Sequence, residues 1–205
     1  NESEVIIGTS SGSFVTAMIR GGALNLDTLT GTGESGDEIR DYLASYLYTR
    51  GVPRGGLRWV RRGLVPALRR PSLHAALGSP GMFRTDGLQQ WVHDGIGPLA
   101  DRWPTKPTAL VAFDLDSKQR VTFGTEDAPD VTLSEAVAAS SAVPFIYEPV
   151  KLDGRWYADG GMASGTSLDL VLAHPEPLDL IIVVAPFAAT APRSRGRMYE
   201  DIFDR

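Results

Sequence analysis

Residues 4–19 read EVIIGTSSGSFVTAMI, which places a short apolar run directly before a serine flanked by glycines. Residues 4–7 predict a strand, and the apolar side chains from Phe14 onward recur at the spacing of a helix face. Between them lies Gly8-x-Ser10-x-Gly12, where a tight strand-to-helix turn would present the Ser10 hydroxyl in the open, with no side chain at the glycines to clash. The start of the helix, including the Ser11 N–H group, would face an oxyanion formed at that serine. The stretch therefore predicts an α/β unit with a candidate nucleophile.

A nucleophilic serine needs a base, and histidine is the usual one. The chain has three histidines, each more typical of a surface or packing position: His74, His93 and His174. An order Ser…Asp…His could still be met by Ser10, by Asp114 or Asp116, and by His174. This combination is one hypothesis for the base.

Asp159 is the other candidate base. It follows the strand-like residues 155–158 and precedes Gly160 and Gly161, which let another backbone segment approach closely. An aspartate with an ordinary pKa of about 3.9 is a weak base toward serine in water. In a desolvated site, in hydrogen-bond contact with the hydroxyl, it can serve.

The rest of the chain alternates strand and helix patterns. Strands are expected over 108–113, 121–123 and 155–158 and in the apolar run 180–185, with turns at 116–119 and 153–154. Helices are expected over 35–50, from Thr85 as a cap, from Thr132 to a stop at Pro144, and over 167–173; Ser35 with Glu38 and Thr132 with Glu135 have capping-box spacing. Such alternation favours an α/β fold with a mostly parallel sheet.

Composition bounds the function classes. The 205 residues suit a single domain, and 42% hydrophobic with 22% charged residues is ordinary for a globular protein. The absence of cysteine excludes a disulfide scaffold, a zinc ribbon and a thiol nucleophile. No signal peptide is evident, and no apolar run approaches the roughly 20 residues that span a bilayer. We expect a cytoplasmic or peripheral membrane protein from a bacterium.

The net charge of −5 conceals a basic segment. Residues 43–85 contain eight arginines and no acidic residue, a charge of +8 that leaves −13 on the remainder. Arg58, Trp59, Arg61 and Arg62 combine basic and aromatic side chains as segments at an anionic membrane interface do. The alternative is a solvated insertion that pairs with the acidic remainder. Nucleic acid is not an expected partner, because no recognised binding module accompanies this charge.

Four segments together resemble the patatin-like phospholipases. They are the Gly8–Ser13 elbow after its strand, Phe113-Asp114-Leu115-Asp116 leading into residues 121–124, Ala138-Ala139-Ser140-Ser141-Ala142-Val143-Pro144, and Trp156-Tyr157-Ala158-Asp159-Gly160-Gly161. The resemblance covers about residues 4–26 and 107–186, whereas 27–106 is expected to be a variable, partly arginine-rich insertion.

The resemblance implies a three-layer α/β/α fold that hydrolyses lipid esters with a Ser–Asp dyad and with neither metal nor other cofactor. It assigns Ser10 as nucleophile and Asp159 as general base, with Gly8, Ser11 and Gly12 shaping the elbow and oxyanion site and Gly160 and Gly161 the turn after the base. An inactive membrane-binding module of the same family is the non-enzymatic alternative.

One part of the family pattern is missing from the sequence. Only seven residues precede Gly8, and none resembles the family's Gly-Gly-Gly-x-Arg/Lys-Gly loop, which supplies oxyanion donors. The expectation is a single domain over 1–205 that lacks its first strand and this loop. Loss of one oxyanion donor typically costs 10²–10³ in rate, so residues 1–205 alone are expected to be nearly inactive.

Overall fold

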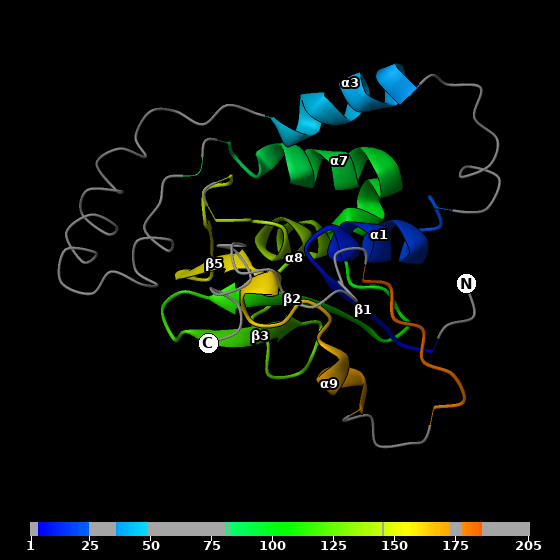
Figure 1. Cartoon of the computed structure of the whole chain (residues 1–205), viewed down its shortest axis with the longest axis vertical. Coiled ribbons are helices and arrows are strands. Elements are labelled where there is room, and N and C mark those ends of the chain that lie inside the picture. The colour runs from blue at the N-terminus through cyan, green and yellow to red at the C-terminus, as the bar shows by residue number, and fades with distance from the viewer. Residues whose placement is uncertain are drawn as a thin grey trace, which may run out of the picture.

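A computed structural model describes residues 4–24, 36–48, 81, 83–144, 146–172 and 178–185. Its strands are β1 (Ile6–Thr9), β2 (Thr108–Asp114), β3 (Gln119–Phe123), β4 (Val150–Leu152) and β5 (Arg155–Asp159). Its helices are α1 (Ser11–Arg20), α3 (Gly36–Leu47), α7 (Asp86–Ile96), α8 (Leu133–Ser140) and α9 (Leu168–Leu172), with short 3-10 turns η2 (Gly97–Asp101) and η3 (Gly160–Met162). The predicted α/β class and its layers are confirmed, with helices packed on a central sheet (Figure 1).

The sheet is built around β2, all of whose seven residues are buried. It is parallel at its start, where β1 pairs with β2, and antiparallel where β3 and β5 pair with β2 and where β4 pairs with β5, so the described sheet is mixed, whereas a mostly parallel sheet is expected from the sequence. β3 covers residues 110–114 of β2 on one edge, so β1 and β5 share the other edge. β1 pairs with residues 108–111 and β5 with residues 112–114, and the two strands therefore follow one another along that edge.

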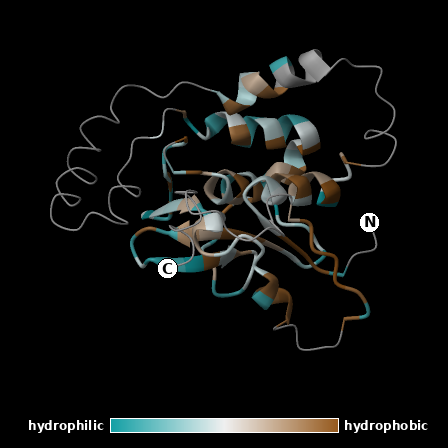
Figure 2. Ribbon diagram, viewed as in Figure 1, coloured by the Kyte–Doolittle hydropathy of each residue, from teal (hydrophilic) through white to brown (hydrophobic). Residues whose placement is uncertain are grey.

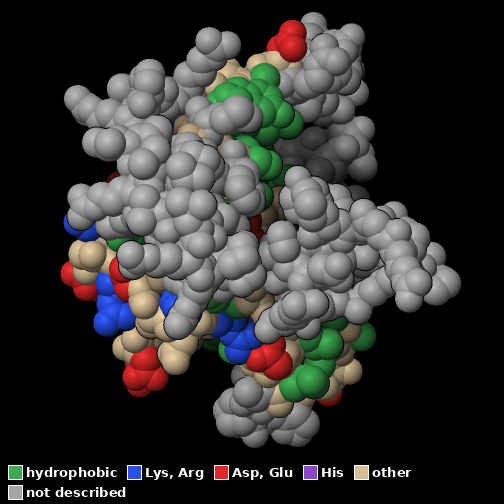
Figure 3. Space-filling view, turned by 60° about the vertical axis from the view of Figure 1, so that its left-hand side comes forward, with side chains coloured by type: hydrophobic (Ala, Val, Ile, Leu, Met, Phe, Trp, Pro, Cys, Tyr) green, Lys and Arg blue, Asp and Glu red, His purple; other side chains and the backbone are tan. Residues whose placement is uncertain are grey.

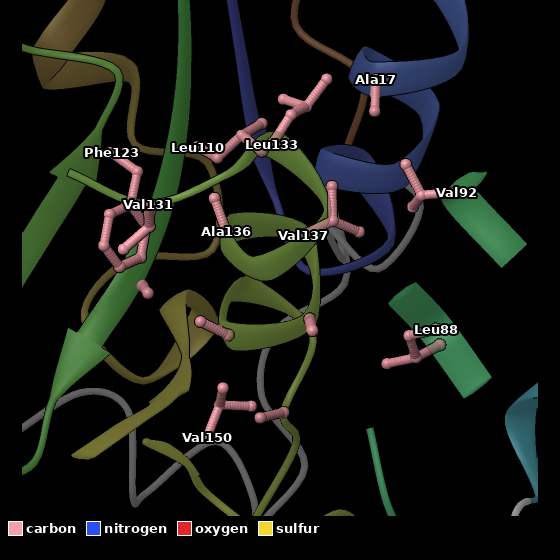
Figure 4. Close-up of a cluster of buried hydrophobic side chains, with 14 of the residues drawn as sticks. Ala17, Leu88, Val92, Leu110, Phe123, Val131, Leu133, Ala136, Val137 and Val150 are labelled. Atoms are coloured by element: carbon pink, nitrogen blue, oxygen red, sulfur yellow. The ribbon is translucent and has the colours of Figure 1, made fainter. Parts of the chain in front are cut away.

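Helix α8 is the centre of the core. Its capping box is confirmed, because the Thr132 hydroxyl accepts from the Glu135 N–H group and the Glu135 carboxylate accepts from the Thr132 N–H group. Small residues predominate in α8, so this helix packs closely between the sheet and α7. Figure 4 shows its side chains between Leu110 of β2 and Val92 of α7. Helix α1 lies on the same face of the sheet, and α9 lies on the opposite side in Figure 1.

The two predicted hairpin turns are confirmed, although the first covers residues 115–118 and Gln119 already belongs to β3. Between β4 and β5, Asp153 and Gly154 have φ of 44° and 80°, the positive values that a two-residue hairpin turn of this hand requires. Between β2 and β3, the Asp114 carboxylate accepts hydrogen bonds from the N–H groups of Asp116 and Ser117. These turns bring β3 and β5 back onto β2, where β5 delivers Asp159 to the sheet.

Several predicted boundaries require correction. The strand expected over 4–7 begins at Ile6, and the helix expected over 35–50 ends at Leu47, while Ser35 lies outside the described residues. Thr85 precedes α7 but makes no side-chain cap, because its φ of −88° and ψ of −4° keep it in the helical region. Helix α8 ends at Ser140, before Pro144.

The apolar run 180–185 was expected to be a strand, and this prediction is wrong for the described structure. None of the described strands pairs with it, and a strand needs a neighbour for its backbone N–H and C=O groups. Leu180, Ile182 and Val184 are 74%, 77% and 82% exposed. Figure 2 shows the run as a hydrophobic stretch on the outside of the described structure.

Candidate active site

The sheet register brings Ser10 and Asp159 together. Thr9, the last residue of β1, is paired with Val111, and Asp159, the last residue of β5, is paired with the adjacent Ala112. Because β1 runs parallel and β5 antiparallel to β2, their C-terminal ends meet on the shared edge. Ser10 directly follows Thr9, so two residues far apart in the sequence become neighbours through β2.

Ser10 has an unusual backbone conformation. Its φ of 55° and ψ of −128° lie in a region that residues with a side chain rarely adopt, at a cost of about 1–3 kcal/mol. The conformation turns the chain sharply from β1 into α1, as the Gly8-x-Ser10-x-Gly12 pattern predicts. Ser10 is partly exposed and Ser11 is exposed, so the turn is open to approach from solvent. The first N–H groups of α1, those of Ser11 and Gly12, have no acceptor within the helix and can bind an oxyanion there.

Two of the four predicted glycines are required by close backbone approach. A Cβ atom on Gly8 would lie 2.7 Å from the Gly12 carbonyl oxygen and the Ser13 Cα atom. A Cβ atom on Gly160 would lie 2.2 Å from the Val111 carbonyl oxygen. At Gly12, by contrast, a Cβ atom would meet no described atom within 4 Å, so packing against the described residues does not explain this glycine.

Asp159 is a buried carboxylate that is only half satisfied. Its side chain is fixed by the Gly161 N–H group, which donates to Oδ1 at 2.7 Å, whereas the buried Oδ2 atom has no hydrogen bond of ordinary geometry within the described structure. Burial raises the pKa of Asp159, and the Ser10 hydroxyl and the Gly161 N–H group oppose this rise without cancelling it. The Ser10 hydroxyl thus lowers the pKa of this carboxylate without making a hydrogen bond of ordinary geometry to it. A buried carboxylate with a raised pKa and one unsatisfied oxygen is suited to accept a proton from the hydroxyl.

Asp114 is also buried, but both of its carboxylate oxygens are hydrogen-bonded. Oδ1 accepts two backbone N–H groups of the hairpin turn, and Oδ2 accepts from the Arg155 guanidinium at 3.0 Å. Burial acts to raise the pKa of Asp114, but the hydrogen bonds, chiefly from Ser117 and Asp116, hold it below the ordinary value. Asp116 accepts from the Trp156 N–H group. These contacts tie Asp114 to the β2–β3 turn and to β5, and they tie Asp116 to β5, so both carboxylates of the histidine hypothesis already have partners.

The histidines lie away from Ser10 or outside the described residues. His93, on α7, contacts Ser134 at 3.4 Å and Asp101 at 3.5 Å, both through Nε2. A catalytic triad uses the two ring nitrogens separately, so this cluster lacks the geometry of a second hydrolase site. His74 and His174 fall outside the described residues, so the structure does not test the hypothesis that His174 is the base.

The remaining predicted features are only partly covered. Arg58, Trp59, Arg61 and Arg62 fall outside the described residues. Arg84, the described arginine of the basic segment, forms an ion pair with Asp86. On the face shown in Figure 3, the described Lys and Arg side chains lie close to Asp and Glu side chains. Within the described ranges, no helix is long and apolar enough to cross a membrane, and no three His, Asp or Glu residues are grouped as metal ligands.

Sequence reasoning assigned no role to three further serines that contact Ser10. The Ser140 Oγ atom accepts from the Ser10 N–H group at 3.1 Å, and the hydroxyls of Ser13 and Ser141 donate to the Ser10 carbonyl oxygen at 2.6 Å and 3.0 Å. The sequence does mark two of these serines, because Ser140 and Ser141 belong to the small-residue segment ending in Pro144. Nothing in their spacing, however, indicated which backbone they would bind.

Comparisons with known proteins identify the family of the chain. The sequence model of the family described as "Patatin-like phospholipase" matches residues 3–172. Uncharacterized NTE family proteins of Mycobacterium bovis and Mycobacterium tuberculosis are 33% identical over 111 residues, which is 50% of this chain and 28% of the relative. A protein of Invertebrate iridescent virus 6, named "Probable lipid hydrolase 463L", is 23% identical over 96 residues, 44% of this chain and 33% of the relative. The matched region thus spans about a third or less of these relatives.

Proposed function

Because the chain belongs to the patatin-like phospholipase family, we propose that it is a lipid acyl hydrolase in which Ser10 is the nucleophile and Asp159 the general base. One observation carries the proposal: the shared edge of β2 places the serine turn beside a buried carboxylate with a raised pKa. The likeness to a lipid hydrolase and to NTE family proteins supports the substrate class.

In the first half of the reaction, the Ser10 Oγ atom attacks the ester carbonyl carbon and its proton passes to Asp159. The negative charge on the former carbonyl oxygen is stabilised by the N–H groups of Ser11 and Gly12 at the start of α1. The tetrahedral intermediate then collapses: the bond to the alcohol oxygen breaks, and Asp159 returns the proton to that oxygen. The products are the free alcohol or lysolipid and an acyl ester on Ser10.

In the second half, water replaces the alcohol. Asp159 accepts a proton from the water molecule as its oxygen attacks the acyl carbon, and the same N–H groups stabilise the charge. Collapse of this intermediate releases the fatty acid, and Asp159 returns the proton to Ser10 Oγ. The raised pKa of Asp159 serves both half-reactions, since a carboxylate with a higher proton affinity is a stronger base.

The test is covalent labelling of the natural protein with a fluorophosphonate probe, followed by mass mapping of the modified residue. We expect the label on Ser10, no label in Ser10→Ala, and release of fatty acid from phospholipid vesicles that both Ser10→Ala and Asp159→Asn abolish. Ser134→Ala is the matched control, because it removes another buried serine hydroxyl at the other end of α8, next to His93. A natural protein that does not label at Ser10 would refute the proposal.

A further inference from the structure

The end of α8 contacts the backbones of both Ser10 and Asp159. Ser140 and Ser141 bind the peptide groups on the two sides of Ser10, and the Ala142 carbonyl oxygen accepts from the Asp159 N–H group at 3.0 Å. Three consecutive residues thus touch the two groups whose relative placement the proposed reaction depends on.

The Ser140 hydroxyl makes two hydrogen bonds, as donor in one and as acceptor in the other. It donates to the Val111 carbonyl oxygen at 2.6 Å, which leaves a lone pair to accept the Ser10 N–H group at 3.1 Å. Val111 is the β2 residue paired with Thr9 and lies at the point where β1 and β5 meet. Ser140 is fully buried, so solvent cannot replace either bond.

Ser141 acts on the other side of Ser10. The Ser10 carbonyl oxygen accepts the Ser141 hydroxyl at 3.0 Å, the Ser13 hydroxyl at 2.6 Å and the Ser13 N–H group at 2.9 Å. Each hydroxyl has a single proton, so once both protons are directed at this oxygen, the 3.3 Å approach of the Ser13 and Ser141 hydroxyls is only a contact. The carbonyl is thereby held from α1 and from α8.

We infer that Ser140 and Ser141 are positioning residues, which hold the Ser10 peptide in its turn conformation and in register with Asp159. The N–H and C=O groups that flank the φ and ψ angles of Ser10 are both bound, so neither angle can relax without breaking a hydrogen bond to α8. The shared contact through Ala142 means that a shift of the α8 end would move both groups. This inference rests on the proposed function and extends it to residues that do not touch the reacting atoms.

The test compares Ser140→Ala and Ser141→Ala with Ser134→Ala in the natural protein. We expect the rate constant for fluorophosphonate labelling of Ser10, and kcat for ester hydrolysis, to fall about 10- to 100-fold in the first two variants, with KM changed less than about twofold. Ser134→Ala should keep the wild-type labelling rate. Melting temperature is measured on the same samples, so that each comparison is made between folded proteins.

A conservative variant separates positioning from a general packing role. Ser141 is half-buried and tolerates a methyl group better than the fully buried Ser140, so Ser141→Thr should restore labelling to within about threefold of wild type. If Ser140→Ala does not fold, the Ser141 pair of variants carries the test alone. Wild-type labelling rates in folded Ser141→Ala would overturn the inference while leaving the proposed function in place. Absence of Ser10 labelling in the unsubstituted protein would instead refute the proposed function.

Discussion

Replacing Ser10 by glycine should make the protein more stable than replacing it by alanine. The φ of 55° and ψ of −128° cost a residue with a Cβ atom about 1–3 kcal/mol, and glycine avoids this cost. Glycine in turn gives the unfolded chain extra conformational freedom, which offsets about 0.4–1 kcal/mol. The net expectation is about 1 kcal/mol in favour of Ser10→Gly, which for a domain of this size corresponds to about 2–4 °C in melting temperature.

The comparison is made by calorimetry on the two variants under identical conditions. Both lack the hydroxyl that acts on Asp159, so the loss of that interaction cancels and backbone strain remains as the main difference. Both variants should be catalytically inactive. Equal melting temperatures, or a lower value for Ser10→Gly, would refute the reasoning that the serine turn stores backbone strain.

Three further predictions concern the pKa of Asp159 and the packing of Gly160. The rate of ester hydrolysis should fall as the pH is lowered, with a midpoint above the ordinary aspartate pKa. The reason is that burial raises the pKa of Asp159 and only its ionised form accepts a proton. A pH–rate profile with a midpoint near 3.9 would contradict this prediction. Asp159→Asn should raise the melting temperature at pH 7, and this gain should disappear toward pH 4. A carboxyl whose pKa is higher in the folded state stabilises folding only while it is protonated, and this contribution is lost as pH rises through the folded pKa. A gain in melting temperature that stays constant between pH 4 and pH 7 would argue against a raised pKa of Asp159. Gly160→Ala should destabilise the fold by about 2 kcal/mol or more in denaturant titrations, because its Cβ atom would overlap the Val111 carbonyl oxygen. The control is Gly165→Ala, whose Cβ atom would meet no described atom within 4 Å. This variant should change the free energy of unfolding by less than about 0.5 kcal/mol. Similar values for the two glycine variants would contradict the close approach of η3 to β2.

The local elements could be predicted because their signals lie within a few residues of one another. The Thr132 capping box, the turn at Asp153 and Gly154, and the turn at Ser10 each depend on side chains and dihedral angles inside one short segment. The run 180–185 shows the limit of such signals. Its apolar side chains are typical of a strand, but a strand also requires a paired neighbour, and none of the described strands provides one.

By itself, the sequence determined the candidate groups for the proposed reaction: a serine on a glycine-flanked turn, an aspartate before two glycines, and a segment of small residues ending in proline. Only the tertiary structure decided how these groups meet. The register on β2 places the ends of β1 and β5 at Val111 and Ala112, the burial of Asp159 raises its pKa, and the end of α8 supplies hydroxyls to the Ser10 peptide. Register, desolvation and hydrogen bonds across more than a hundred residues are properties of the packed chain, because they depend on which surfaces exclude water together rather than on any local pattern.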